Sequence, residues 1–312
     1  MTILIALLLT LFPLANTYAS SLPSPYGSAT TPTDAQRVNE LLQRGQRFGS
    51  QDADELMVFY ASELKDIPYV GQTLEVNTTE QLVVNLRELD CTTLVENAVA
   101  LTLTTLQGSL RFEDYCQHLQ RIRYHNGVMK GYASRNHYFS EWILSNEAMG
   151  LVKEIEGKKN DSRGAFFPFI EQQTLNCSYM SKHPDLYPML RNNELAQKNI
   201  RQNEEQINGK TVHYIPRRLL NRGRKDLGCI HDGDILAIVT KKEGLDTSHL
   251  GIAVWGTDGK LHLLNASQIH KKVVLEPMTL YDYMKKHPSQ LGVRVVRVGA
   301  KGKYKTANNN TE

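Results

Sequence analysis

Cysteine and aromatic residues are scarce in this sequence, and its charges nearly cancel. Only 8% of the 312 residues are aromatic and the formal charge is +3, with no dense Lys/Arg block interleaved with aromatic side chains. These shortages argue against a nucleic acid as partner. None of the four cysteines has CxxC spacing and no HExxH segment occurs, so neither a metal nor another cofactor is expected. The remaining composition, 41% hydrophobic and 22% charged, is typical of a soluble globular protein.

The first twenty residues, "MTILIALLLTLFPLANTYAS", predict export. Residues 3–14 form an apolar stretch of signal-peptide length that is too short to anchor in a bilayer, and the small residue Ala19 ends the expected cleavage site. No Lys or Arg precedes the apolar stretch, which leaves an uncleaved interfacial helix as the alternative. We therefore predict a signal peptide over 1–19, no stable membrane insertion after cleavage, and a periplasmic location.

The four cysteines are Cys91, Cys116, Cys177 and Cys229. In an exported protein they have access to an environment in which disulfides form. If Cys91 is a working thiol, the other three allow at most one bridge, whose pairing the sequence does not reveal.

The N-terminal third predicts helices. After a Ser/Thr/Pro-rich exposed lead-in over 20–33, apolar residues at helical spacing between 34 and 64 indicate two helices broken near "FGSQDAD". The segment "EQLVVNLREL" fits either an amphipathic helix or an extended strand. In "LDCTTLVENAVALTLTTL", Asp90 is a good N-cap for a helix that is apolar on nearly all sides and therefore buried. Because the helix begins with the polar sequence Asp-Cys-Thr-Thr, we expect its N-terminus to face a polar environment.

The rest of the chain predicts an α+β domain over 34–300. Residues 112–225 are expected to form a helical and loop-rich insertion, including a polar helix in "LRNNELAQKNIRQNEEQING". The cationic cluster "IPRRLLNRGRK" fits a solvated, ion-paired loop or attraction to an anionic envelope surface. Later, "GDILAIVT", "HLGIAVWG", "KLHLLNAS" and "VRVVRVG" predict antiparallel strands, with "TLYDYMKKHP" as a helix and 301–312 as a disordered tail.

Cys91 is a candidate nucleophile because backbone N–H groups at a helix N-terminus favour a thiolate. The adjacent Asp90 opposes this charge, so a cationic partner is needed, and histidine is the natural one. His249 follows the loop "EGLDTS" at the start of a strand, which places it at the rim of a sheet. A lone strand histidine is more often structural, so its neighbours decide its role.

Asn265 is the neighbour that matters. A two-residue Asp-Gly loop in "GTDGK" would place His249 and Asn265 on opposite faces of the hairpin. A three-residue Thr-Asp-Gly loop, with Gly259 in the left-handed conformation, pairs Gly251 with Asn265 instead. His249 and Asn265 then become diagonal neighbours on one face, within side-chain reach. A His249–Asn265 pair therefore requires the longer loop.

Several motifs in order resemble one family. "DIPYVGQTLE", "LDCTTLVENAVAL", "SRNHYFSEWI", "GDILAIVTKKEGLDTSHLGIAV" and "LHLLNAS" are similar to the N-acetylmuramoyl-L-alanine amidase-like family of the papain-like NlpC superfamily of cell-wall hydrolases. The resemblance implies a nucleophile helix packed on an antiparallel sheet. It implies Cys91 as nucleophile, His249 as general base and then acid, Asn265 as the orienting residue and Tyr69 near the oxyanion. Relatives usually carry histidine where this chain has Asn265, which can still fix the imidazole tautomer.

The same resemblance implies a substrate-binding set around "ASRNHYF". Arg135 could pair with a substrate carboxylate, and His137 and Tyr138 could line a sugar or peptide pocket. For the aromatic residues, a helix that packs them into the core is a nearly equal explanation, whereas for Ser134 and Arg135 a functional role is favoured. The full set of predicted substrate-binding residues is Ser134, Arg135, His137, Tyr138, Asp90 and Ser248.

We therefore predict an exported cysteine amidase acting on peptidoglycan or muropeptides. The expected bond joins N-acetylmuramic acid to L-alanine, and the mechanism requires no metal. The alternatives are a γ-D-glutamyl-diaminopimelate endopeptidase or an acyltransferase with the same machinery, and a wall-binding module without catalytic activity.

Overall fold

The computed structural model describes residues 30–156 and 168–299. The predicted signal peptide over 1–19, most of the lead-in and the tail over 301–312 lie outside the described residues. Within the described ranges the chain forms helices and an antiparallel sheet, which confirms the predicted α+β class. In these ranges no helix combines the length and the apolar character needed to cross a bilayer.

The regular elements follow the chain in blocks. The described helices are α1 (Pro32–Phe48), α2 (Ala53–Glu63), α3 (Cys91–Leu106), α4 (Phe112–Arg123), α5 (Phe139–Ala148), α6 (Tyr179–Lys182), α7 (Glu194–Ile207) and α8 (Leu280–Lys285), with short 3₁₀ turns η1 (His125–Gly127), η2 (Tyr132–Ser134), η3 (Pro184–Leu186) and η4 (Arg217–Leu219). The strands are β1 (Val152–Glu154), β2 (Glu171–Thr174), β3 (Thr211–Pro216), β4 (Ile235–Thr240), β5 (Thr247–Trp255), β6 (Leu261–Ser267), β7 (Lys272–Leu275) and β8 (Gln290–Val298).

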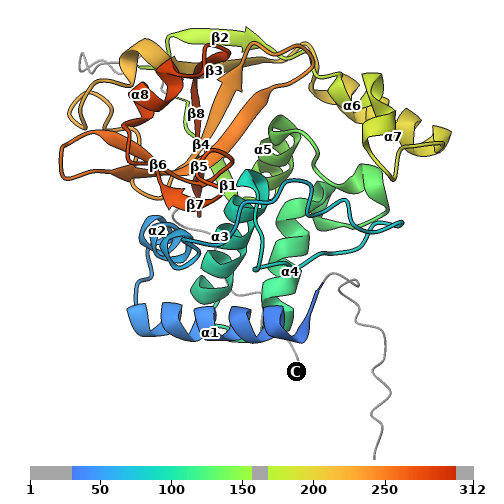
Figure 1. The fold of residues 1–312 in the computed structure, drawn as a ribbon, viewed down its shortest axis with the longest axis horizontal. Helices are drawn as coiled ribbons and strands as arrows, with labels where there is room; N and C mark the ends of the chain where they lie inside the picture. Colours follow the sequence, from blue (N-terminus) through green and yellow to red (C-terminus); the bar gives the residue numbers. More distant parts are fainter. Residues whose placement is uncertain (1–29, 157–167, 300–312) are drawn as a thin grey trace, which may run out of the picture.

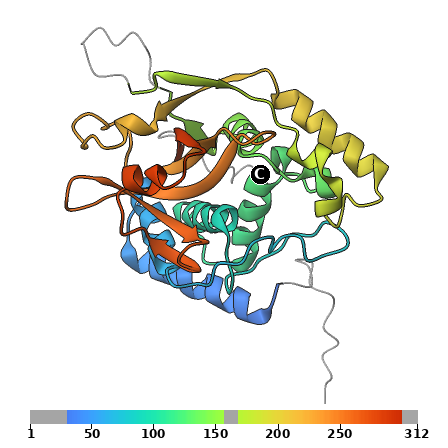
Figure 2. The same cartoon turned by 45° about the horizontal axis from the view of Figure 1, so that its top comes forward.

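Helix α3 lies at the centre of the molecule. Its N-cap Asp90 accepts a hydrogen bond from the backbone N–H of Thr93 at 2.8 Å, and the backbone N–H of Asp90 donates to the Thr93 hydroxyl at 2.9 Å. Every α3 residue from 93 to 105 is buried, because α1, α2, α4 and the sheet surround the helix (Figures 1 and 2). At the N-terminus, Cys91 and Thr92 are only partly buried, so this end of the helix opens onto a polar space, as predicted.

The sheet has the order β2-β3-β8-β4-β5-β6-β7, with β1 paired to β8. One face packs against α3 and its neighbouring helices, and the other packs against α8 and η4 (Figure 1). The central strand β4 is buried along its whole length. This sandwiching fixes β5, whose N-terminal end carries His249, directly beside α3.

The hairpin between β5 and β6 has the predicted three-residue loop. The backbone N–H of Gly256 donates to the Lys260 carbonyl at 2.8 Å, and Gly259 adopts a φ of 71°. The observed pairing of Ile252 with Leu264 continues to Gly251 opposite Asn265. The register that brings His249 and Asn265 to one face is confirmed.

Other expectations are only partly met. The four predicted C-terminal strands are confirmed as β4, β5, β6 and β8, while β7 and the short strands β1 to β3 were not expected. "EQLVVNLREL" contains no helix, since its apolar residues enter the core from an irregular segment. Within the expected insertion over 112–225, α4 and α5 pack into the same core as α3, and β1 to β3 join the sheet. All four cysteines are free thiols.

Candidate active site

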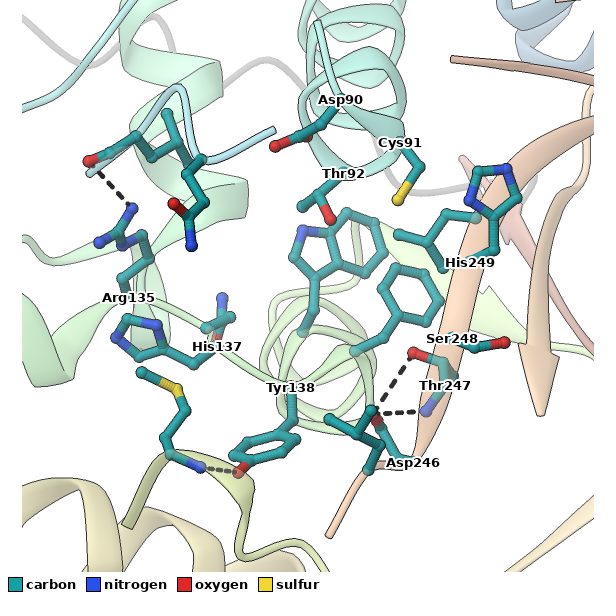
Figure 3. Close-up of a pocket in the computed structure, with 18 of the residues that line it drawn as sticks. Asp90, Cys91, Thr92, Arg135, His137, Tyr138, Asp246, Thr247, Ser248 and His249 are labelled. Atoms are coloured by element: carbon teal, nitrogen blue, oxygen red, sulfur yellow. Dashed lines mark hydrogen bonds between the residues drawn. The ribbon is translucent and has the colours of Figure 1, made fainter. Parts of the chain in front are cut away.

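A cavity of about 320 Å³ opens at the N-terminus of α3 (Figure 3). Its walls come from the irregular segment after Tyr69, the start of α3, the segment leading into α5, and the first residues of β5. Seven of the ten predicted site residues line it: Asp90, Cys91, Arg135, His137, Tyr138, Ser248 and His249. Three others, Tyr69, Ser134 and Asn265, lie outside the lining.

Cys91 and His249 lie next to each other at one edge of this cavity (Figure 3). Cys91 is the first residue of α3, and His249 is the third residue of β5. The backbone N–H of Leu250, which follows His249, and that of Thr92 lie within hydrogen-bond reach of the Cys91 sulfur. Both side chains are partly exposed, so a ligand in the cavity can reach them.

Asn265 contacts the ring of His249. His249 Nε2 lies 2.9 Å from Asn265 Oδ1, and Asn265 Nδ2 donates to the Leu263 carbonyl at 3.3 Å. Because the amide nitrogen is engaged there, Oδ1 is the atom that faces the ring, and it can only accept. Nε2 therefore carries the imidazole proton, and Nδ1 is left as the basic nitrogen. Asn265 itself is fully buried.

The surroundings of the thiol and the imidazole favour the neutral form of each. Burial, followed by the Asp90 carboxylate, raises the pKa of the Cys91 thiol to about 11. Burial lowers the pKa of His249, and the hydrogen bond with Asn265 opposes that shift only in part. The Asp90 carboxylate therefore disfavours ionisation of the Cys91 thiol, as expected from the sequence. A resting thiolate–imidazolium pair is not expected at neutral pH, so any proton transfer from sulfur accompanies the reaction.

Tyr69 lies close to this pair. Its backbone pairs with Leu89, just before Asp90, and its side chain is half-buried. Burial, with smaller contributions from Cys91 and Asp90, raises the pKa of the phenol. The hydroxyl therefore stays protonated at neutral pH and can donate a hydrogen bond.

Arg135 is already paired inside the protein. Its guanidinium lies 2.8 Å from Glu75 Oε1 and 3.4 Å from Glu80 Oε2, and the residue is only 4% exposed. It also lies over the Tyr132 ring at 4.8 Å. The carboxylates of the segment before α3 therefore already pair with this guanidinium. Binding of a substrate carboxylate by Arg135, which lines the cavity, stays a prediction. Arg135 holds that segment as a wall of the cavity.

We expect Arg135→Ala to reduce the free energy of unfolding by about 3–5 kcal/mol, because it removes a buried guanidinium and leaves the largely covered carboxylates of Glu75 and Glu80 without this counter-charge. Urea unfolding measures this difference. Arg111→Ala is the matched control, since its contact with Glu113 at 3.5 Å lies between exposed side chains and should contribute less than about 1 kcal/mol. Equal losses in the two variants would contradict the interpretation of Arg135.

The polar atoms of three further predicted residues are engaged within the protein. His137 Nε2 lies 2.8 Å from the Tyr132 carbonyl, and burial together with Arg135 holds the pKa of His137 well below its usual range. The Tyr138 hydroxyl donates to Glu204 at 2.7 Å and accepts from the Met180 backbone. Ser134 closes a local turn through Gly131 and Lys130. His137 and Tyr138 therefore shape the cavity, whereas Ser134 lies behind it.

Several lining residues were not predicted from the sequence, among them the acidic residues Glu75 and Asp246. Of these two, Asp246 lies nearer to His249 in sequence. Its carboxylate accepts hydrogen bonds from the backbone N–H group of Ser140 at 2.6 Å and from that of Thr247 at 2.7 Å; Figure 3 shows the contact with Thr247. It thereby joins the start of α5 to the start of β5. The available signal was its place three residues before His249 in "EGLDTSH". In the described part of the chain, no group of three or more His, Cys, Asp and Glu side chains is arranged to hold a metal ion.

Comparison with known proteins assigns a family to this fold. The model of the N-acetylmuramoyl-L-alanine amidase-like family matches residues 60–293. The crystal structure of an N-acetylmuramoyl-L-alanine amidase from Bacteroides uniformis is 37% identical, with a TM-score of 0.72, over 80% of this chain and 99% of that one. A Bacteroides fragilis structure that bears the provisional name of a xylanase is 39% identical, with a TM-score of 0.69, over 77% of this chain and 100% of that one.

A more distant structure, from Legionella pneumophila, shares the fold at 22% identity, with a TM-score of 0.64, over 86% of this chain and 95% of that one. No curated protein matches the chain. The family match covers most of the sequence and includes every residue described in the cavity. The chain therefore belongs to the N-acetylmuramoyl-L-alanine amidase-like family.

Proposed function

We propose that this protein is an exported, periplasmic cysteine amidase that cleaves the N-acetylmuramoyl-L-alanine bond of peptidoglycan. Cys91, His249 and Asn265 would act as its triad, in a papain-like NlpC arrangement. The observation that carries this proposal is the 2.9 Å contact between His249 and Asn265, in the same cavity wall where Cys91 begins α3. Family membership and the predicted leader over 1–19 support the peptidoglycan substrate and export.

The reaction begins with a neutral pair. His249 Nδ1 takes the thiol proton as the Cys91 sulfur attacks the amide carbonyl. The backbone N–H of Cys91 and the Tyr69 hydroxyl stabilise the oxyanion that forms. His249 then gives its proton to the leaving amine of L-alanine, which breaks the C–N bond and leaves a thioester. A water molecule activated by His249 hydrolyses the thioester and restores the thiol.

The charge of the cavity favours the muramoyl bond over its nearest alternative. Glu75, Asp90 and Asp246 line the cavity against the single guanidinium of Arg135. The acyl group of an N-acetylmuramoyl amide is a neutral lactoyl sugar, whereas a γ-D-glutamyl acyl group carries a free carboxylate close to the scissile bond. An acidic lining disfavours binding of a γ-D-glutamyl group, because its free carboxylate carries a charge of the same sign.

Mass analysis of defined muropeptides tests the proposal. The wild type should release free N-acetylmuramic acid, or its disaccharide, and an intact peptide beginning with L-alanine, while Cys91→Ala should release neither. Products cut after D-glutamate would identify an endopeptidase, and adducts with added amines would identify an acyltransferase. Unchanged substrate with both proteins, under reducing conditions and across pH, would favour a wall-binding module.

We expect Asn265→Ala to lower kcat/KM by about 10- to 100-fold, the range seen when a polar group that orients a histidine is lost. Without the Asn265 oxygen the imidazole can adopt the wrong tautomer or rotate away from Cys91. Asn265→His supplies a ring nitrogen in the same place and should recover part of the activity. Steady-state kinetics of the three proteins checks this order, and wild-type activity in Asn265→Ala would rule out an orienting role.

A further inference from the structure

A second hollow, lined by cationic side chains, lies where η4, α8 and the start of β8 meet. Its volume is about 370 Å³, and its charged lining residues are Arg217, Arg218 and Lys285. Among the described residues that line it, none is acidic. The two arginines belong to the "IPRRLLNRGRK" cluster, which the proposed amidase reaction does not use.

Arg217 is the best-fixed of these cations. Its Nη1 donates to the Met284 carbonyl at 3.2 Å and to the Gln290 carbonyl at 3.4 Å, so the end of α8 and the start of β8 hold the guanidinium in place. In the described ranges no carboxylate lies within ion-pair distance of it. The N–H groups on Nε and Nη2 remain available, and a half-buried guanidinium without a counter-charge favours binding of an anion.

The other two cations are more exposed and only partly neutralised. Arg218 pairs with Glu171 at 2.7 Å, and Lys285 lies 3.9 Å from Asp282 and 5.3 Å from the centre of the Tyr281 ring. The three groups reach the hollow from η4 and from α8. Donors from different directions suit a tetrahedral anion better than a planar carboxylate.

The rest of the lining is largely apolar, and consists of Pro216, Tyr281, Pro288 and Leu291 beside the polar Gln290. A ligand that fits both parts combines an anionic group with a small organic group. We propose that this hollow binds a phosphate ester, carried either by a soluble polymer or by a lipid headgroup.

Helix α8 connects this hollow with the candidate active site. Tyr281 and Lys285 line the hollow, while the Tyr283 ring lies 6.3 Å from the His249 ring. A polymer or membrane bound at the phosphate site is therefore held one helix away from the cavity that contains Cys91. The site would keep the protein on a phosphate-bearing surface without contributing to bond cleavage.

Isothermal titration of the full chain with glycerol 3-phosphate and with inorganic phosphate, against sodium chloride at equal ionic strength, tests the site. Both phosphates should bind and chloride should not. Lys285→Glu should weaken binding by at least about tenfold, the effect of losing one charge-assisted contact. Arg222→Gln is the matched control: it lies in the same sequence cluster, pairs with Asp226 at 3.3 Å and is not part of the lining.

Lys285→Glu is preferred to Arg217→Gln because Arg217 also holds α8 against β8. The variant should retain wild-type activity on soluble muropeptides. Co-sedimentation with phosphatidylglycerol vesicles, compared with phosphatidylcholine vesicles, distinguishes the two sources of the phosphate ester. If the wild type pellets selectively with phosphatidylglycerol and Lys285→Glu does not, the ligand is a lipid headgroup. If the wild type binds glycerol 3-phosphate but does not pellet with either vesicle, the ligand is a soluble polymer. Failure of both phosphates to bind at millimolar concentration, or equal affinity in Lys285→Glu and wild type, would overturn the proposal.

Discussion

Replacing His249 with alanine is expected to lower kcat/KM for an N-acetylmuramoyl-L-alanine substrate by about 10³- to 10⁴-fold, near the upper limit of what a general acid–base group contributes. The loss should be large because the Cys91 pKa of about 11 leaves almost no thiolate at neutral pH. Without His249, the reaction loses the group that we propose takes the thiol proton and protonates the leaving amine. Steady-state hydrolysis of a defined muropeptide measures the effect.

His262→Ala provides a matched control. His262 lies on the neighbouring strand β6, contacts the Glu276 carbonyl at 3.1 Å and Asp258 at 3.2 Å, and is not part of the cavity lining. Its replacement should change kcat/KM by less than about threefold, as expected for a site outside the reacting groups. If the two variants lost similar activity, the effect of His249→Ala would be structural rather than catalytic.

The second large effect concerns the pH dependence of Cys91 alkylation. With a pKa of about 11, only about one thiol in 10⁴ is ionised at pH 7. Iodoacetamide should therefore react slowly at neutral pH, and its rate should rise about tenfold per pH unit, or about 10³-fold between pH 7 and pH 10. A preformed thiolate–imidazolium pair would instead give a fast and nearly constant rate between about pH 5 and pH 8.

Mass spectrometry must locate the label, because Cys229 is also partly exposed and burial raises its pKa to about 11. Cys91→Ser provides the blank. The corresponding activity profile should rise as pH climbs through the lowered pKa of His249, because only the neutral imidazole accepts the thiol proton, and should then stay level until the thiol ionises. Rapid, pH-independent alkylation of Cys91 would show that the neutral resting pair is wrong.

Local signals allowed the central parts of the site to be predicted from sequence. The Asp90 cap and the apolar run after Cys91 define α3 within one stretch of chain. The distance between His249 and Asn265 depends only on the length of one hairpin loop. Short-range rules of capping and register are sufficient for both, because each involves residues that are close in sequence.

The walls of the cavity could not be predicted in the same way. Arg135 meets Glu75 and Glu80 across about sixty positions, and the partners lie in a segment without regular structure. No periodic pattern in the sequence marks such a contact. For this reason Arg135 was predicted to bind a substrate carboxylate rather than Glu75 and Glu80. The neutral state of Cys91 was equally hidden, because the pKa depends on how much protein surrounds the sulfur.

The length of the hairpin loop at 257–259 also restricts how homologous sequences can diverge. Substitution of Thr257 or Asp258 leaves strand alternation untouched. Insertion or deletion of one residue, if β6 were to shift by one position, would turn Asn265 toward the opposite side of the sheet and separate it from His249. Among active homologues, the number of residues in this turn should therefore be inherited more strictly than their identity, and single-residue indels there should coincide with loss of the enzyme's chemistry.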